Sequence, residues 1–177
     1  MRLIVISDTH GSLKHIPDIL ARHPHDVAFH CGDFCYPREK APELTYVRGN
    51  CDSDMEVPEE NVIRIGPLLI FQTHGHLYGV KQTPMRLRYK AIETGANLVL
   101  FGHTHEITAI EDDGILYVNP GSLLLPRSYT LPTYAVLDVE EAEKDKVKIT
   151  VSFYSMGGRK QPGLSRDFLL PRANDRE

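Results

Sequence analysis

The chain has no tryptophan, only three cysteines and no long hydrophobic run among its 177 residues. No apolar segment approaches the ~20 residues that a membrane-spanning helix needs. The formal net charge of −4 gives no basic footprint of the kind that grips long nucleic acid. We therefore expect no contact with a membrane, and the composition disfavours nucleic acid as a partner.

The cysteines, Cys31, Cys35 and Cys51, are odd in number and lack the spacing of a zinc finger. The apolar stretch at residues 3–6 is too short for a secretory signal. We expect a cytoplasmic protein with reduced thiols and no structural disulfide. Cys31, at the end of an apolar run, should pack as a small hydrophobic side chain.

Apolar runs alternate with turn residues over the first hundred positions, which predicts mixed βαβ units. Helices are expected at residues 16–22 and after Thr83, where Met85, Tyr89 and Ile92 keep helical spacing and Gly95 supplies the stop. Asp113-Gly114 predicts a hairpin turn, and the later strands should be antiparallel. Strands are expected at residues 3–6, 27–31, 44–47, 62–65, 68–73, 98–101, 133–139 and 147–154.

The length suits one domain with a substantial core. We place that domain at residues 1–156. Residues 157–177 are rich in Gly, Pro and Arg and are expected to form a mobile C-terminal tail. The sequence does not determine the oligomeric state, and a homo-oligomer is compatible with it.

Five strand-like runs are each followed by side chains that bind metals. In open α/β sheets, ligands bind at the carboxyl ends of the strands. A single Asp or Asn after a strand is usually a turn residue or a helix cap, and a single His is more often structural. The repeated occurrence at the same place favours a metal site. The residues concerned are Asp8, His10, Asp33, Asn50, His74, His103 and His105.

This ordered set resembles the calcineurin-like metallophosphoesterases, and most closely their small single-domain bacterial and archaeal phosphodiesterases. The resemblance covers Met1 to about Val139. It includes Val118-Asn119-Pro120-Gly121-Ser122, which we interpret as a structural turn near the site, and Gly49-Asn50-Cys51-Asp52, where many members have His after the Asn. The resemblance implies an α/β fold, a four-layer αββα sandwich of two mixed β-sheets flanked by helices.

The resemblance also implies a binuclear metal centre. Asp8, His10, Asp33 and His105 would hold one divalent ion, and Asp33, Asn50, His74 and His103 would hold the other. Asp33 would bridge the two ions. Oxygen and imidazole ligands fit Mn²⁺, our first choice, as well as Ni²⁺, Fe²⁺, Co²⁺ or Zn²⁺.

The implied function is a metal-dependent phosphodiesterase acting on a small or nucleotide-like substrate by attack of a metal-bridging hydroxide. The neutral amide of Asn50 would keep the centre positively charged toward phosphate. Because Cys51 replaces the usual His, His76 is our candidate acid for the leaving group, with a structural loop role as the alternative. Arg127 is a candidate ligand for a phosphate oxygen, with a surface ion pair as the alternative. Two other functions stay open: a non-catalytic protein-binding scaffold of the same fold, and a nuclease.

Overall fold

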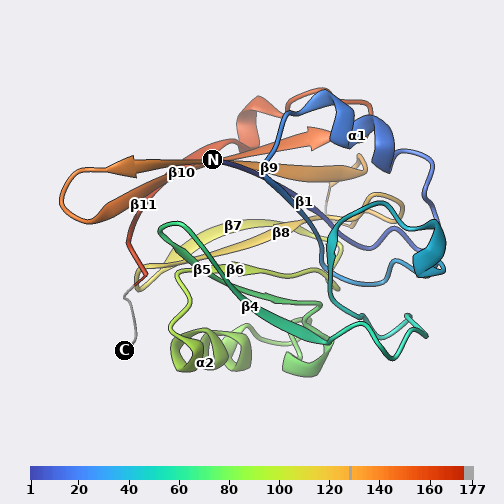
Figure 1. The fold of residues 1–177 in the computed structure, drawn as a ribbon, viewed down its shortest axis with the longest axis horizontal. Helices are drawn as coiled ribbons and strands as arrows, with labels where there is room; N and C mark the ends of the chain where they lie inside the picture. Colours follow the sequence, from blue (N-terminus) through green and yellow to red (C-terminus); the bar gives the residue numbers. More distant parts are fainter. Residues whose placement is uncertain (128, 174–177) are drawn as a thin grey trace.

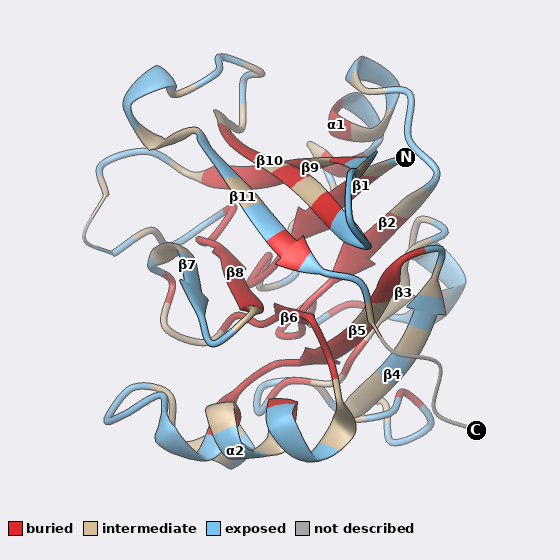
Figure 2. Cartoon of the chain, turned by 90° about the vertical axis from the view of Figure 1, so that its left-hand side faces the viewer, coloured by how far each residue is buried: buried red, intermediate tan, exposed pale blue. Residues whose placement is uncertain are grey.

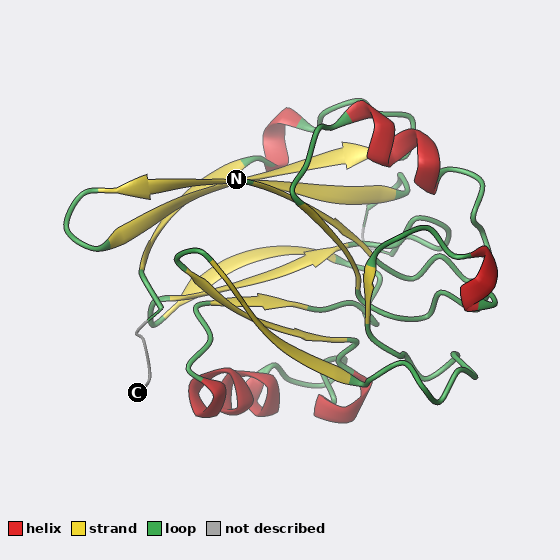
Figure 3. Cartoon of the chain, viewed as in Figure 1, coloured by secondary structure: helices red, strands yellow, loops and turns green. Residues whose placement is uncertain are grey.

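Two β-sheets packed face to face, each with a helix on its outer side, make up the protein (Figure 1). The computed structural model describes residues 1–127 and 129–173. The layers are visible edge-on in Figure 3, where the helices lie above and below the two sheets. This arrangement confirms the four-layer αββα sandwich predicted from the sequence.

The first sheet has six strands in the order β11-β10-β9-β1-β2-β3. β1, β2 and β3 are parallel, and the remaining pairs are antiparallel, so the sheet is mixed. Its strands are β1 (Arg2–Ile6), β2 (Val27–His30), β3 (Thr45–Tyr46), β9 (Thr133–Ala142), β10 (Lys146–Ser155) and β11 (Arg166–Pro171).

The second sheet has five strands in the order β4-β5-β6-β8-β7 and is also mixed. β5, β6 and β8 are parallel neighbours, and β4 and β7 pair antiparallel at the two edges. Its strands are β4 (Glu60–Ile65), β5 (Leu68–Thr73), β6 (Leu98–Leu100), β7 (Ile107–Asp112) and β8 (Ile115–Pro120).

The helices are short and lie mostly outside the sheets. They are α1 (Ile16–Arg22), α2 (Met85–Thr94) and the 3₁₀ turns η1 (Arg38–Lys40), η2 (His76–Tyr78) and η3 (Pro162–Leu164). No helix of the described residues is long and apolar enough to cross a membrane.

The strand β1 is apolar at nearly every position because both of its faces are covered. Leu3 and Val5 point into the core between the sheets, whereas Ile4 and Ile6 pack under α1. Figure 2 shows the resulting pattern, with buried central strands and exposed edges. Cys31 lies fully buried in the core between the sheets, as predicted.

The helix expected after Thr83 is present as α2, and Gly95 ends it, as predicted. On α2, Met85, Tyr89 and Ile92 keep helical spacing but are exposed, and the helix buries Leu87 and Ala91 instead.

One expectation from the sequence needs correction, namely that the segment from residue 157 is a mobile tail separate from the domain. Arg166–Pro171 form β11, which pairs with β10 at the edge of the first sheet. Leu170 is buried in the core between the sheets. The segment up to residue 173 therefore packs as part of the domain, and residues 174–177 of the expected tail lie outside the described residues.

Candidate metal centre

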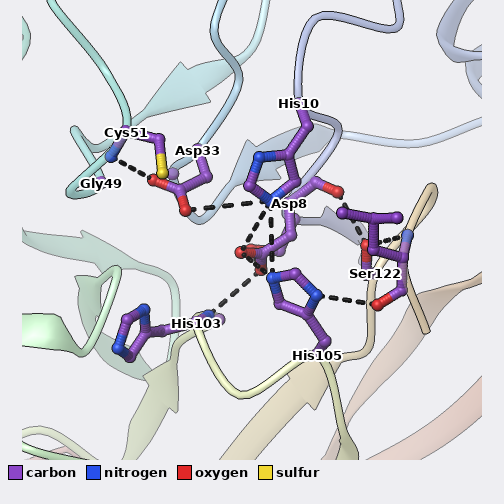
Figure 4. Close-up of polar contacts among 12 residues, drawn as sticks. Asp8, His10, Asp33, Gly49, Cys51, His103, His105 and Ser122 are labelled. Atoms are coloured by element: carbon purple, nitrogen blue, oxygen red, sulfur yellow. Dashed lines mark hydrogen bonds and ion pairs between the residues drawn. The ribbon is translucent and has the colours of Figure 1, made fainter. Parts of the chain in front are cut away.

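The side chains predicted as ligands follow the carboxyl ends of β1, β2, β3, β5 and β6, at one edge of the two sheets. Figure 4 shows the carboxyl group of Asp8 between the rings of His10 and His105, with the carboxyl group of Asp33 reaching the same nitrogen of the His10 ring. Possible ligand atoms lie within 4.8 Å of one another in three overlapping groups. The groups are Asp8, His10 and His105; His10, Asp33 and Cys51; and Asp33, His74 and His103.

Two carboxylate oxygens form the middle of this arrangement. Asp8 Oδ1 lies 3.1 Å from His105 Nε2 and 3.9 Å from the Nε2 atoms of both His10 and His74. Asp33 Oδ2 lies 3.3 Å from His74 Nε2 and 3.9 Å from His10 Nε2. Asp33 thus reaches residues of both outer groups, which is the position a bridging ligand requires.

Two of these buried atoms make no hydrogen bond among the described residues: Asp8 Oδ1 and His74 Nε2. Both side chains are fully buried. Buried polar atoms nearly always have a partner, so two orphans facing each other indicate a missing one. A divalent cation bound between carboxylate and imidazole would satisfy both atoms, and the donor set fits such an ion.

The imidazole rings of His74 and His105 are each oriented by a hydrogen bond from Nδ1, the nitrogen that does not face the carboxylates. His74 Nδ1 donates to the carbonyl of Cys31 at 2.6 Å, and His105 Nδ1 donates to that of Leu125 at 2.7 Å. Because a carbonyl only accepts, each Nδ1 carries the proton and each Nε2 keeps its lone pair toward the carboxylates. This is the usual support of a metal-binding histidine.

The second oxygen of Asp8 is also fixed. Asp8 Oδ2 accepts hydrogen bonds from Ser7 Oγ at 2.5 Å and from the backbone N–H of His103 at 3.1 Å. Gly102 permits this approach, because a Cβ there would lie 2.1 Å from Ser7 Oγ. The loop after β6 is therefore held directly against the loop after β1.

The backbone of the ligand loops is unusual. Five ligand residues have positive φ, a region that Asp and His tolerate better than most residues but that remains uncommon. They are Asp8 (54°), His10 (43°), Asp33 (55°), His103 (67°) and His105 (60°). Backbone hydrogen bonds between neighbouring loops, Asp8 N to Gly32 O and His10 N to Asp33 O, hold two of them in place. Such conformations persist when the surrounding structure fixes them, and they cluster at functional sites.

One residue of importance to the site was not identified from the sequence. The carboxylate of Asp52 accepts hydrogen bonds from the backbone N–H groups of Asp33 and Gly49, both at 2.7 Å, and of Cys35 at 2.8 Å. It thereby joins the loop after β2 to the loop after β3. The available signal was an Asp just after a Gly-Asn turn, a residue type that commonly binds local backbone N–H groups.

The Asn-Pro-Gly-Ser segment has the structural role expected of it. Asn119 is fully buried, and its Nδ2 donates to Gly102 O at 2.9 Å and to Thr104 Oγ1 at 3.0 Å. Ser122 Oγ donates to the carbonyl of Asp8 at 2.8 Å. The hydrogen bonds of this segment thus hold the loop of Asp8 and the loop of His103 in place.

The charges of the centre reinforce one another. Burial raises the pKa of Asp33, but the close contact with His74 and its charge together lower it well below its ordinary value. The pKa of Asp8 is lowered in the same way, against its burial, by His105 and His74. The site therefore carries two carboxylates that remain ionised at neutral pH.

The histidines fall into two classes. The close contact with the carboxylate of Asp8 raises the pKa of His105, and for His74 the pull of Asp33 and Asp8 outweighs burial and raises the pKa as well. Burial and the charge of His74 instead lower the pKa of His103 to about 4. His103 is thus neutral at pH 7 and free to donate its lone pair.

Four residues with a predicted or uncertain part in catalysis lie around the candidate ligands, and we call this group the rim: Asn50, Cys51, His76 and Arg127. Asn50 is exposed and donates to Cys51 Sγ at 3.4 Å, and the Cys51 N–H donates to Asp33 Oδ1 at 2.9 Å. The ring of His76 is centred 5.4 Å from that of His74, and its Nδ1 is buried and makes no hydrogen bond to any residue that the structure describes. Arg127 is exposed, and its backbone N–H donates to the carbonyl of His105 at 3.0 Å.

Comparison with known proteins agrees with this geometry. Over 174 residues, the chain is 37% identical to the probable metallophosphoesterase YsnB of Bacillus subtilis, which covers 96% of this chain and 100% of that protein. It is 31% identical over 171 residues to the phosphodiesterase MJ0936 of Methanocaldococcus jannaschii, covering 81% and 96% of the two chains. A crystal structure of a conserved uncharacterized protein, predicted phosphoesterase, from Streptococcus pneumoniae matches with a TM-score of 0.86 and 32% identity, covering 95% and 97%.

The family model of the calcineurin-like phosphoesterase superfamily domain matches residues 1–142. That range contains all seven predicted metal ligands and the strands that carry them. Matched over most of its length and built around the same fold, the chain belongs to the calcineurin-like phosphoesterase superfamily.

Proposed function

We propose that this protein is a metal-dependent phosphodiesterase that hydrolyses a small or nucleotide-like diester at a two-metal centre. The observation that carries the proposal is the position of Asp33 Oδ2, 3.3 Å from His74 Nε2 and 3.9 Å from His10 Nε2. One carboxylate therefore stands between two groups of imidazole ligands, each group with its own carboxylate contact. The similarity to a named phosphodiesterase supports the same reaction.

The residues divide into two ligand sets with one shared member. Asp8, His10, Asp33 and His105 would hold one ion, and Asp33, Asn50, His74 and His103 would hold the other. When bound, two divalent ions would supply an activated water and the positive charge that favours attack on phosphorus. Mn²⁺ is the ion we would restore first, with Ni²⁺, Fe²⁺, Co²⁺ and Zn²⁺ as the alternatives to compare.

The rim residues would act on the substrate. The amide of Asn50 adds an oxygen ligand without adding negative charge, so the centre keeps its attraction for phosphate. Arg127 would bind a phosphate oxygen, since a guanidinium can donate two parallel hydrogen bonds. His76 would donate a proton to the leaving oxygen, since it stands beside the His74 ligand and the Cys51 thiol is a weak acid. Because burial and the charge of His74 lower the pKa of His76, it would be protonated mainly below neutral pH.

Two observations argue against the two alternatives that the sequence left open: the buried orphan atoms against the scaffold, and the net charge against the nuclease. A scaffold that binds only proteins gains nothing from leaving Asp8 Oδ1 and His74 Nε2 unsatisfied in its interior, a cost of about 1–3 kcal/mol for each such group. A nuclease acting on long chains would gain from a basic surface, and the net charge here is −4.

The test is metal reconstitution followed by an assay. Protein stripped with a chelator should lose activity on bis(p-nitrophenyl) phosphate and recover it with Mn²⁺, at close to two ions per chain by elemental analysis. Asp33→Asn should lose both the metal and the activity. Asp167→Asn, an exposed substitution on β11, is the matched control and should change neither. Activity that survives both chelation and Asp33→Asn would refute the proposal.

A further inference from the structure

An apolar groove lies on the outer face of the second sheet, between α2 and the β7–β8 hairpin. Its volume is about 500 Å³, within the range of small-molecule sites. Figure 2 shows β7 exposed at the edge of the sheet, with α2 in the layer below it. The groove is lined mainly by Val80, Leu87, Phe101, Thr108, Ile110 and Tyr117.

One polar atom in this groove has no partner. The hydroxyl of Tyr117 is buried and makes no hydrogen bond among the described residues, and the residue as a whole is only 8% exposed. Burial, with a smaller contribution from the charge of Asp112, raises its pKa to about 12, so the hydroxyl stays protonated and can donate. A buried donor without an acceptor is rare and points to a ligand that supplies one.

The groove lies next to the metal centre. Thr104 and Glu106, which flank His105 in the chain, are among its lining residues. Val80 also lines it and is followed in the chain by Lys81, whose positive charge acts on His103. A molecule with its phosphate at the centre can therefore extend past Thr104 into the groove.

The lining of the groove selects against a second anion. Glu106, Glu111 and Asp112 line the groove, and Arg88, the cation of the same lining, is paired with Asp112 at 2.5 Å. A second phosphate would meet the carboxylates of Glu106, Glu111 and Asp112. The one cation of the lining, Arg88, would not offset them, because its charge is already balanced by Asp112. An uncharged planar ring would instead cover Leu87, Phe101 and Ile110 and offer an acceptor at its edge to Tyr117.

We propose that this groove binds an uncharged aromatic group, of the kind found in a nucleobase, on the ester arm that is retained after cleavage. The inference rests on the proposed function and extends it from a reaction to a substrate class. It assigns Tyr117 and Ile110 to substrate specificity and leaves the chemistry to the metal centre.

The test uses two diesters with the same leaving group. Thymidine 5′-(p-nitrophenyl phosphate) and methyl p-nitrophenyl phosphate both release p-nitrophenolate, so a difference in kcat/KM reports the retained arm alone. We expect the Mn²⁺-loaded protein to prefer the thymidine ester by at least about 10-fold, since burying one aromatic ring contributes on that scale. Direct binding of thymidine 5′-phosphate to the loaded protein provides a readout that needs no turnover.

Substitutions in the groove should act on the thymidine ester only. Ile110→Glu places a charge on an exposed apolar position and should remove most of the preference. Tyr117→Phe removes only the hydroxyl and should lower kcat/KM by about 3- to 10-fold, the worth of one hydrogen bond. Ile92→Glu, an equally exposed apolar position on α2 that does not line the groove, is the control. Thermal unfolding of each variant would show that the fold is retained.

The outcomes separate this inference from the proposed function. Equal rates on the two esters, unchanged by Ile110→Glu, would overturn the groove and leave the phosphodiesterase standing. If neither ester is cleaved but thymidine 5′-phosphate binds and Ile110→Glu weakens it, the groove stands and the reaction falls. Binding that is absent, or equally weakened by Ile92→Glu, would overturn the groove.

Discussion

The buried half of the centre and its exposed rim are built differently. Asp8, Asp33 and His74 are buried, with hydrogen bonds to backbone groups or Ser7 around them. Asn50 and Arg127 at the rim are exposed. The buried half thus has its geometry set before any ion or substrate arrives, whereas the rim can adjust to what binds. Preorganised groups contribute most where charge must be stabilised, so we expect the two halves to respond very differently to substitution.

His74→Ala should have the largest effect. It removes a buried ligand whose position is fixed by Cys31, and we expect activity to fall by at least about 1,000-fold, as for one member of a catalytic unit. Elemental analysis should show the loss of about one ion per chain. His25→Ala, at an exposed position away from the site, should leave both quantities unchanged. Full metal content in His74→Ala would contradict the ligand assignment.

Asp52→Ala tests whether the rim loops depend on the buried half. Three backbone N–H groups would lose their acceptor, and the loops of Asp33 and Asn50 would separate. We expect metal affinity to fall by about 10- to 100-fold, the usual effect of removing a group that positions ligands. Asp52→Asn keeps one acceptor oxygen, so its metal affinity should lie between those of the wild type and Asp52→Ala. An equal loss in the two variants, measured by titration with Mn²⁺, would show that the charge matters and not the hydrogen bonds.

The pH dependence of metal binding should reveal the two classes of histidine. His74 and His105 have raised pKa values in the metal-free fold and hold protons below them, and an ion must displace those protons. Metal affinity should therefore rise as pH increases through neutrality and level off above these pKa values, by up to about tenfold per pH unit for each displaced proton. Calorimetry in buffers of different ionisation enthalpy counts the protons released. His103, with a pKa of about 4, should contribute none near pH 7; proton release unchanged in a His105→Gln variant would contradict this division.

Asn50→Asp should have the smallest effect on activity among these changes. The substitution keeps an oxygen ligand at an exposed position but adds a negative charge to the centre. Metal should remain bound, and turnover should fall by about 10-fold or less, because phosphate is attracted less. Turnover equal to that of the wild type, measured at saturating Mn²⁺, would show that the charge at position 50 does not matter.

The sequence predicted which side chains gather at the candidate site because a local rule governs their positions. Each follows an apolar strand, and parallel strands end at a common edge, so placing the strands also places Asp8, Asp33 and His74 together. Much of the fold class was implied by the family resemblance, and the strand pattern agreed with it.

What could not be predicted depends on partners distant in the chain. A Gly-, Pro- and Arg-rich segment gave no local sign that Leu170 would pair with β10, because strand formation depends on neighbours more than on intrinsic preference. On α2, the spacing of Met85, Tyr89 and Ile92 was right for a helix, but the face that packs is the one with Leu87 and Ala91. The role of Asp52 could not be predicted, because it depends on which backbone N–H groups of two separate loops lie close to its carboxylate.

The positive φ angles of the ligand loops imply a trade between stability and activity. At His10, where φ is 43°, the side chain contacts mainly the other ligands, so its conformation serves the centre and not the fold. His10→Gly should be inactive. In the metal-free form, however, its free energy of unfolding should exceed that of His10→Ala by about 0.5–1 kcal/mol, because glycine adopts this φ without a Cβ penalty. Denaturant unfolding of the two variants measures the difference. A higher stability of His10→Gly than of His10→Ala would show that the backbone conformation at position 10 costs the fold free energy and is kept for the site.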